Sequence, residues 1–403
     1  MNEQSTALPL DDGMTKDRGG FSLVLGGPLF QLLIAAHLSD DALHVVHRRI
    51  IAFVLLAWLP LLVLSFVGGQ ALAGSVAVPF VRDVEVHARF LVALPLLVIA
   101  ELMVHQRMRP IVAQFLKRRL IPENAVASFN AALASAMRLR NSVLVEVAII
   151  AVVYVVGVIA WRRYMSLDAA TWYATSSREG ARLSLAGAWY CYVSLPLFQF
   201  LLIRWYFRIL IWARFLYQVS RIKLVLIPSH PDRVGGLGFL AGTLQAFSPL
   251  AAAHGALLAG LIADRIFYLG ATLPQFKFEI AAVVVFMLGL TLGPLLAFSS
   301  QLAAAKRSGG LEYGELAEDY VRAFHVKWLH GKPVDEPLVG SSDIQSLADL
   351  ANSFEVVRSM RLVPFTRDGL VLMGATTLAP ILPLALTMMP LDDILKALLG
   401  VLF

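Results

Sequence analysis

The sequence predicts an all-α, polytopic membrane protein with about seven transmembrane helices and additional cytoplasmic amphipathic helices. Of the 403 residues, 58% are hydrophobic and only 15% are charged, whereas a soluble domain has about 25% charged residues. The mean hydropathy is +0.71, and the apolar residues gather in runs long enough to cross a bilayer. This composition excludes a soluble globular enzyme, a disordered chain and a typical nucleic-acid-binding domain.

Seven runs of about 18 or more mostly apolar residues predict the spans. They cover residues 50–67, 88–104, 142–161, 183–203, 239–263, 280–303 and 370–388. A shorter run, 28–37, indicates an interfacial or re-entrant helix. We therefore expect a flexible cytoplasmic N-terminus (1–27), a membrane domain of six spans (28–303) with a cytoplasmic helical loop (105–141), a cytoplasmic helical hairpin (304–364), and a last span with a short C-terminal interfacial helix (365–403).

Basic residues predict the orientation. With the N-terminus inside, 25 of the 34 Lys and Arg residues fall on the inner side and 9 on the outer side, as the positive-inside rule requires. We expect a multi-pass protein of a bacterial inner membrane, with its N-terminus in the cytoplasm and its C-terminus in the periplasm. The net charge of +6 then reflects anchoring in the membrane, and no nucleic-acid partner is expected.

Residues 183–227 are too long for one simple span. Continuous helix over this stretch would measure about 67 Å. An eighth span over 207–227 would bury Arg208, Arg214, Arg221 and Lys223, at about 2.5–3.5 kcal/mol each near the bilayer centre. We expect a span to Ile203 and then a basic extension that lies along the inner surface or reaches into the cytoplasm, with the extra span left as the alternative.

Ionisable side chains well inside spans are expensive, and so each one is a functional candidate. Glu101 and Glu146 lie about one turn inside the inner boundary of their spans, with His105 and Arg107 near the first and Arg138 and Arg140 near the second. Either they pair locally at helix ends, or they line an inner vestibule that binds cations or relays protons.

The fifth predicted span carries an unusual set of polar residues: Thr243, Gln245, Ser248 and His254. It is either a tightly packed central helix whose histidine is hydrogen-bonded to a neighbour, or the lining of a pathway with a proton-sensitive group. Pro249 would free the backbone carbonyl of Gln245, and such carbonyls serve as ion ligands in transporters.

The loop before this span is the most distinctive short motif. His230-Pro231-Asp232-Arg233 and the glycines Gly235 and Gly236 predict a tight connection. Asp232 either caps the next helix, or the loop is a gate at the inner mouth where His230 and Asp232 bind an ion.

No motif supports a catalytic or metal centre. Asp40, Asp41, His44 and His47 are closely spaced, but they fit a helix N-cap followed by an inner membrane boundary. Cys191 is the one cysteine, which rules out a multi-thiolate zinc site. We expect no catalytic residue, metal or cofactor, with an intramembrane lipid-modifying enzyme kept as a remote alternative.

These observations predict an ion channel or ion-coupled transporter whose pathway is lined by the fifth span. Its partners would be the lipid bilayer, a small ion or solute, and further copies of itself in a homo-oligomer. The alternative is a non-transporting membrane sensor or assembly subunit that works through its cytoplasmic helices.

Overall fold

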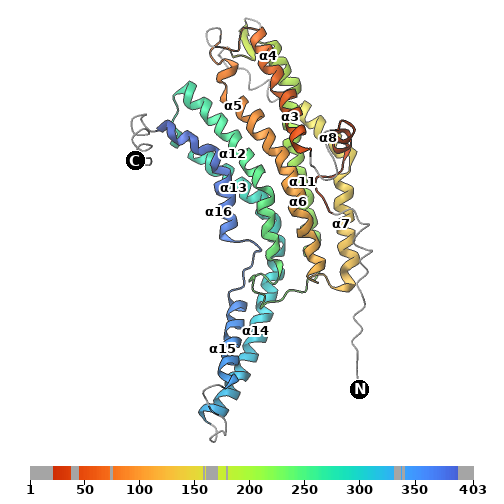
Figure 1. Cartoon of the computed structure of the whole chain (residues 1–403), viewed down its shortest axis with the longest axis vertical. Helices are drawn as coiled ribbons and strands as arrows, with labels where there is room; N and C mark the ends of the chain where they lie inside the picture. Colours follow the sequence, from red (N-terminus) through yellow and green to blue (C-terminus); the bar gives the residue numbers. More distant parts are fainter. Residues whose placement is uncertain are drawn as a thin grey trace.

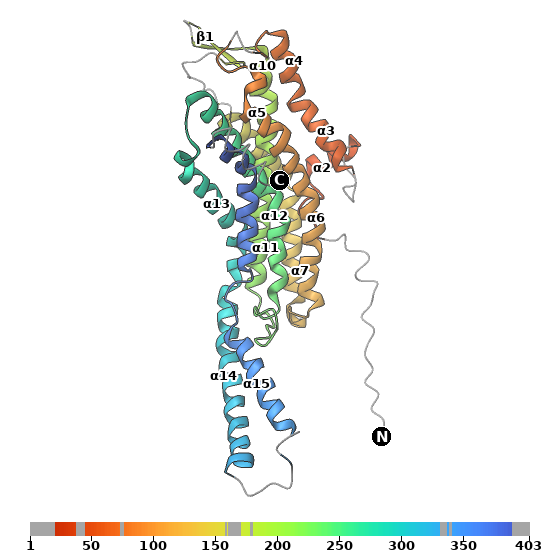
Figure 2. The same ribbon diagram turned by 60° about the vertical axis from the view of Figure 1, so that its left-hand side comes forward.

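The computed structural model describes residues 21–37, 45–72, 76–157, 159, 171–177, 180–330, 337 and 341–388. Figure 1 shows a bundle of long helices with a helical hairpin projecting from one end. We call this the hairpin end. The other end is the strand end, because the short antiparallel pair β1 (Ala174–Ser177) and β2 (Gly180–Leu183) lies there (Figure 2).

The predicted all-α polytopic fold is confirmed. Within the described ranges, six helices are long and apolar enough to cross a membrane: Val46–Val67, Val84–Lys117, Leu185–Ser220, Leu237–Leu269, Leu273–Leu329 and Arg367–Met388. A bent pair, Glu123–Arg140 with Val143–Gly157, adds a seventh if it counts as one span; its two parts meet at 46°. Each of the seven overlaps one predicted run.

Most spans combine several helical segments. The α-helices are α2 (Pro28–Ala35), α3 (Val46–Ala57), α4 (Leu59–Val67), α5 (Val84–His87), α6 (Leu94–Lys117), α7 (Val126–Arg140), α8 (Val143–Val152), α10 (Leu185–Trp189), α11 (Leu195–Ser220), α12 (Gly242–Leu269), α13 (Lys277–Leu292), α14 (Ser299–Phe324), α15 (Ser342–Arg358) and α16 (Arg367–Leu378). The 3₁₀ or π segments are η1 (Phe80–Arg82), η2 (Ala88–Ala93), η3 (Glu123–Ala125), η4 (Val153–Gly157), η5 (Tyr190–Ser194), η6 (Leu237–Ala241), η7 (Leu273–Phe276), η8 (Gly293–Phe298), η9 (His325–Leu329) and η10 (Ala379–Met388).

Helix α12, the fifth predicted span, lies in the middle of the bundle between α6 and α16 (Figure 1). Two glycines allow its backbone to approach these neighbours. A Cβ on Gly255 would lie 2.0 Å from the carbonyl oxygen of Thr377 in α16, and one on Gly260 would lie 2.8 Å from Cβ of Ala88 in η2. Small residues permit such close helix contacts in membranes.

Helix α11 continues without a break after Ile203. Segments α10, η5 and α11 form one helix over Leu185–Ser220, about 54 Å long. The residues after Ile203 continue the helix and pack against α7 and η8. This packing leaves Arg204 only 5% and Arg208 only 3% exposed.

Helix α6 likewise runs through Pro110 to Lys117, and α7 packs back along α11. Phe115 is the centre of an aromatic core in the hairpin half of the bundle, in contact with Phe129, Phe239 and Phe298. Phe21 joins this core against Trp212 and Phe215. Residues 21–24, which belong to the predicted N-terminal segment 1–27, are therefore buried.

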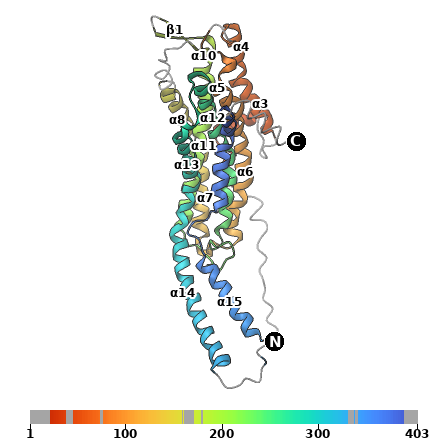
Figure 3. The same ribbon diagram turned by 90° about the vertical axis from the view of Figure 1, so that its left-hand side faces the viewer.

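Helices α14 and α15 form the projecting hairpin (Figure 3). Near its tip, the Asp343 carboxylate accepts hydrogen bonds from Lys327 Nζ at 2.7 Å and Trp328 Nε1 at 3.0 Å. At its base, Lys306 Nζ donates to the carbonyl of Met360 at 2.8 Å. The first helix of the hairpin, α14, begins at Ser299, before the predicted start at residue 304.

Candidate functional site

Glu101 of α6 is surrounded by three arginines. Its Oε1 accepts a hydrogen bond from Arg208 Nη1 at 2.7 Å and lies 3.7 Å from Arg204 Nη1. Its Oε2 lies 2.6 Å from Arg49 Nη2. Glu101 is 6% exposed and Arg49 only 1%, so these ion pairs are shielded from solvent.

Glu146 of α8 extends this network. Arg204 Nη2 lies 3.0 Å from Glu146 Oε1, so Arg204 bridges the two glutamates. Glu146 Oε2 accepts a hydrogen bond from the backbone N–H of Leu29 at 2.8 Å. We call Arg49, Glu101, Glu146, Arg204 and Arg208 the charge cluster. It joins four spans, because its members come from α3, α6, α8 and α11.

The helical repeat of α11 explains how one helix supplies two of the arginines. Arg204 and Arg208 are four residues apart and therefore share a face. Between them, Trp205 donates its indole N–H to the carbonyl of Leu97 in α6 at 2.9 Å, which fixes α11 against α6. The Arg208 guanidinium lies 4.8 Å from the centre of the Trp205 ring, a cation–π contact.

The charge cluster lies deeper than the sequence indicated. Helices α6 and α12 are antiparallel neighbours, and Arg107 Nη1 donates to Gln245 Oε1 at 2.5 Å. Glu101 lies six residues beyond Arg107, about 9 Å further along the bundle. Gln245 is itself about 9 Å from Phe239, where the fifth apolar run begins. Glu101 therefore lies beside the middle of that run.

Arginine is in excess in this cluster. Three guanidinium groups, which stay charged in proteins, face two carboxylates, for a net charge of +1. Arg49 Nε is buried and has no hydrogen-bond partner among the described residues. Nearby, Arg140 Nη1 donates to the carbonyl of Ser22 at 2.5 Å and Arg204 Nη2 to that of Gly26 at 3.4 Å. Backbone carbonyls thus offset only part of the positive charge.

The local pairs expected for the two glutamates do not form. His105 Nδ1 lies 3.0 Å from Ser22 Oγ, and Arg107 binds Gln245. Arg140 binds Ser22 and its neighbour Asn141. The predicted local pairing is wrong because both glutamates face arginines on other helices.

His254 is a packed, hydrogen-bonded histidine. It is 8% exposed, and its Nδ1–H donates to the carbonyl of Leu250 at 2.8 Å. Nε2 then accepts from the Tyr206 hydroxyl of α11 at 2.7 Å. Both ring nitrogens are therefore used within the bundle.

The other polar residues of α12 point in different directions. Thr243 is fully buried, whereas Gln245 is exposed. Pro249 lies inside the helix, and the Ser248 hydroxyl donates to the Gln245 carbonyl at 2.9 Å, so the carbonyl that proline frees is occupied. The structure does not gather Thr243, Gln245, Ser248 and His254 on one face.

The loop His230–Gly238 is organised by one carboxylate. Asp232 Oδ1 accepts from the backbone N–H groups of Val234 and Gly236 at 2.9 and 3.1 Å, and Oδ2 from that of Gly238 at 2.8 Å. Burial alone would raise the pKa of Asp232, but these three donors hold the pKa below its ordinary value. His230 Nδ1 lies 3.0 Å from Asp232 Oδ1.

Positive φ angles at Arg233, Gly235 and Gly236 make this turn possible. The loop is attached to the base of the hairpin, where Arg361 donates its backbone N–H to the carbonyl of Arg233 at 2.7 Å and its Nη2 to that of Asp232 at 3.0 Å. The predicted inner-mouth residues are thus together, but apart from the charge cluster.

Of the possible metal cluster, Asp40, Asp41 and His44 lie outside the described residues. Within the described ranges, no group of three or more His, Cys, Asp or Glu side chains is placed to hold a metal ion.

Sequence reasoning found Glu101 and Glu146 but did not pair them with Arg49, Arg204 or Arg208; it placed Arg49 at the inner boundary and Arg204 and Arg208 in the basic extension after Ile203. One signal was available: two carboxylates inside spans require cations at the same depth, and Arg204 and Arg208 have the four-residue spacing of a single helix face.

No protein-family profile, curated protein or solved structure matches the chain.

Proposed function

We propose that the chain is an ion channel or ion-coupled transporter that moves a small anion, and that the charge cluster is where the anion binds. The observation that carries this proposal is the excess of arginine at Glu101. A net positive charge at this depth is costly unless an anion neutralises it. Rings of arginine and lysine serve this purpose in anion-selective pores.

The location of the cluster also supports transport. It joins helices α3, α6, α8 and α11 at one depth, so a change in its ion pairs would shift several spans together. Helix α12 forms an adjacent wall, where Phe247 contacts Trp205 with ring centres 6.4 Å apart. In this proposal the fifth span flanks the pathway, and its histidine positions Tyr206.

The same proposal includes the orientation and the assembly. The hairpin end would face the cytoplasm of a bacterium, since most lysines and arginines lie towards that side. Exposed apolar side chains on the outer faces of α3, α8 and α13, such as Ile51, Leu144 and Phe278, would face lipid or another copy in a homo-oligomer.

Ion flux into proteoliposomes tests this function. The purified full-length protein would be assayed with chloride, nitrate, phosphate, sulfate and acetate, and with sodium, potassium and protons. We expect flux of at least one anion to exceed that of every cation by tenfold or more. Cation flux without anion flux would contradict the assignment of the ion sign.

A second candidate, a sensor or assembly subunit, is favoured by one observation. The hairpin base is bonded to the loop that starts α12, through Arg361 and the carbonyls of Asp232 and Arg233. Movement of the hairpin would therefore reach the membrane helices. A folded, monodisperse protein that moves none of the ions tested would favour this candidate and contradict transport.

A further inference from the structure

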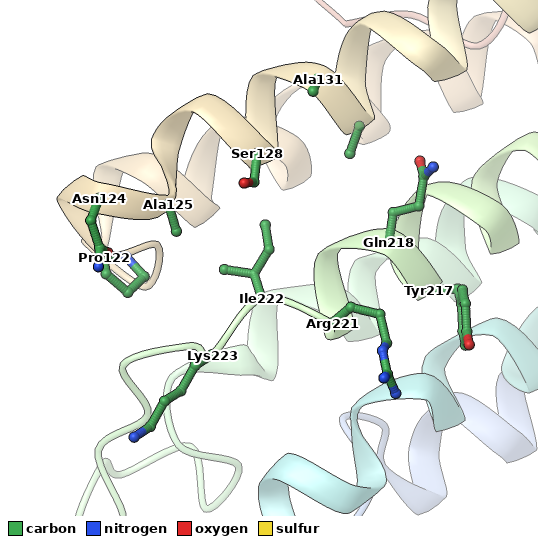
Figure 4. Close-up of a pocket in the computed structure, with 11 residues that line it drawn as sticks. Pro122, Asn124, Ala125, Ser128, Ala131, Tyr217, Gln218, Arg221, Ile222 and Lys223 are labelled. Atoms are coloured by element: carbon green, nitrogen blue, oxygen red, sulfur yellow. The ribbon is translucent and has the colours of Figure 1, made fainter.

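Two grooves on the surface of α11 meet at Tyr217. The first, of about 740 Å³, lies between α7 and the end of α11, and we call it the basic groove. Figure 4 shows α7 along one side of it and Tyr217, Arg221 and Lys223 along the other. The second, of about 570 Å³, lies between α11 and the segments α13 and η8, and we call it the apolar groove. Tyr217, with an exposed fraction of 59%, lines both.

The two grooves differ in chemistry. Arg221 and Lys223 line the basic groove together with polar side chains such as Asn124 and Ser128, and no acidic side chain lines it. The apolar groove has no charged lining residue; its walls include Ile209, Leu210, Leu290 and the glycines Gly289 and Gly293. Together the two grooves therefore offer a cationic surface next to an apolar surface, with Tyr217 shared between them.

The cations at this site are not neutralised by the protein. Arg214, Arg221 and Lys223 are exposed, and none has an ion pair or a side-chain hydrogen bond with any residue that the structure describes. Arg214, Tyr217 and Arg221 are spaced three and four residues apart, so they form one exposed stripe on α11. No described acidic side chain forms an ion pair with this stripe.

The level of the two grooves matches the boundary of a bilayer. The Gln301 side chain of α14 donates to the carbonyls of Ser220 and Ile222 at 2.5 and 2.7 Å. The end of α11 is thus level with the end of the sixth apolar run, which stops at residue 303. From the length of that run we expect the basic groove to lie where the hydrocarbon ends and the apolar groove to lie within the hydrocarbon.

We propose that these grooves bind one phospholipid with an anionic headgroup. Arg221 and Lys223, which line the basic groove, hold the phosphate, because basic pockets between helices on the inner side attract anionic headgroups. An acyl chain passes Tyr217 and lies in the apolar groove. A free phosphate ion would use only the basic groove, so the apolar groove joined to it identifies the ligand as a lipid. This inference does not depend on the proposed ion transport.

Native mass spectrometry and thermal unfolding of the full chain in detergent test this site. Phosphatidylglycerol is expected to remain bound and to raise the melting temperature, whereas phosphatidylcholine, inorganic phosphate and glycerol 3-phosphate are not. An equal effect of phosphatidylcholine, or a full effect of either soluble phosphate, would overturn the proposal.

Two variants separate the two parts of the site. Arg221→Gln/Lys223→Gln should weaken phosphatidylglycerol binding by about tenfold or more, while the exposed hairpin pair Arg307→Gln/Arg322→Gln should not. Gly289→Leu should also weaken binding without any change of charge, because Gly289 lines the apolar groove, a Cβ there meets nothing within 4 Å, and the larger side chain would occupy the groove. Unchanged binding in either test variant would contradict the assignment.

Discussion

Gly27 shows how closely single residues surround the charge cluster. Its φ of 88° is rarely adopted by other residues, and a Cβ there would lie 2.9 Å from Glu146 Oε1. The carboxylate cannot move without loosening its contact with Arg204. A side chain at this position would therefore strain both the backbone and the cluster.

We predict that Gly27→Ala lowers the stability of the protein by about 1–3 kcal/mol. Gly270→Ala is the matched control, because its φ is 65° but a Cβ there meets nothing within 4 Å. Thermal unfolding in detergent measures both. Equal destabilisation by the two substitutions would mean that the contact with Glu146 contributes nothing.

At this scale the sequence located the exceptional residues but not their partners. Glu101, Glu146 and His254 were identified because ionisable groups inside apolar runs are rare. Their partners Arg49, Arg204 and Tyr206 lie on other helices. Neither hydropathy nor spacing along one helix reveals contacts between helices, so the site could be predicted only in part.

Among the connecting elements, the loop His230–Gly238 depends on the ionised form of Asp232. Its pKa lies below the ordinary value of 3.8, because three backbone donors outweigh burial. A carboxyl whose pKa is lowered by folding stabilises the protein above its unfolded pKa, and that stabilisation is lost as the pH falls through the folded pKa.

We predict that Asp232→Asn lowers the melting temperature at pH 6–8 and that its difference from the parent protein shrinks below about pH 4. Both proteins should carry His230→Gln, which removes the neighbouring imidazole. Melting curves across this range measure the effect. A difference that stays constant down to pH 3 would show that the three hydrogen bonds do not require the charge.

Helix lengths were the least predictable feature of the elements. Pro110 and Pro249 suggest breaks, yet α6 and α12 continue through both. At Pro249 a serine hydroxyl occupies the freed carbonyl, and both α6 and α12 pack against neighbouring helices. Such compensation is common in membrane helices, and it depends on packing that is absent from the local sequence.

For the whole molecule, composition and apolar runs were sufficient to predict the all-α polytopic fold, since a bilayer restricts the backbone to helices or closed barrels. They did not predict that α11 stays packed beyond Ile203. The basic residues after Ile203 were interpreted as exposed, whereas Arg204 and Arg208 face Glu101.

The topology can be checked with introduced cysteines. The single native cysteine, Cys191, is 1% exposed and should not react. Inverted vesicles expose the cytoplasmic side to an impermeant reagent, and right-side-out vesicles expose the opposite side. We predict that Glu315→Cys on the hairpin is labelled only in inverted vesicles and Gly270→Cys only in right-side-out vesicles. Labelling of both from one side would contradict a membrane crossing between Gly270 and the hairpin.

The central claim is that the unbalanced arginine of the charge cluster binds the transported anion. Arg208→Gln leaves two arginines and two glutamates, so the cluster becomes neutral while Glu101 keeps Arg49 and Arg204. The control is Arg322→Gln, which removes one charge from the exposed hairpin. The decisive measurement is anion flux through proteoliposomes that contain equal amounts of folded protein. The account predicts that Arg208→Gln reduces this flux by tenfold or more while Arg322→Gln leaves it unchanged; undiminished flux in Arg208→Gln would contradict it.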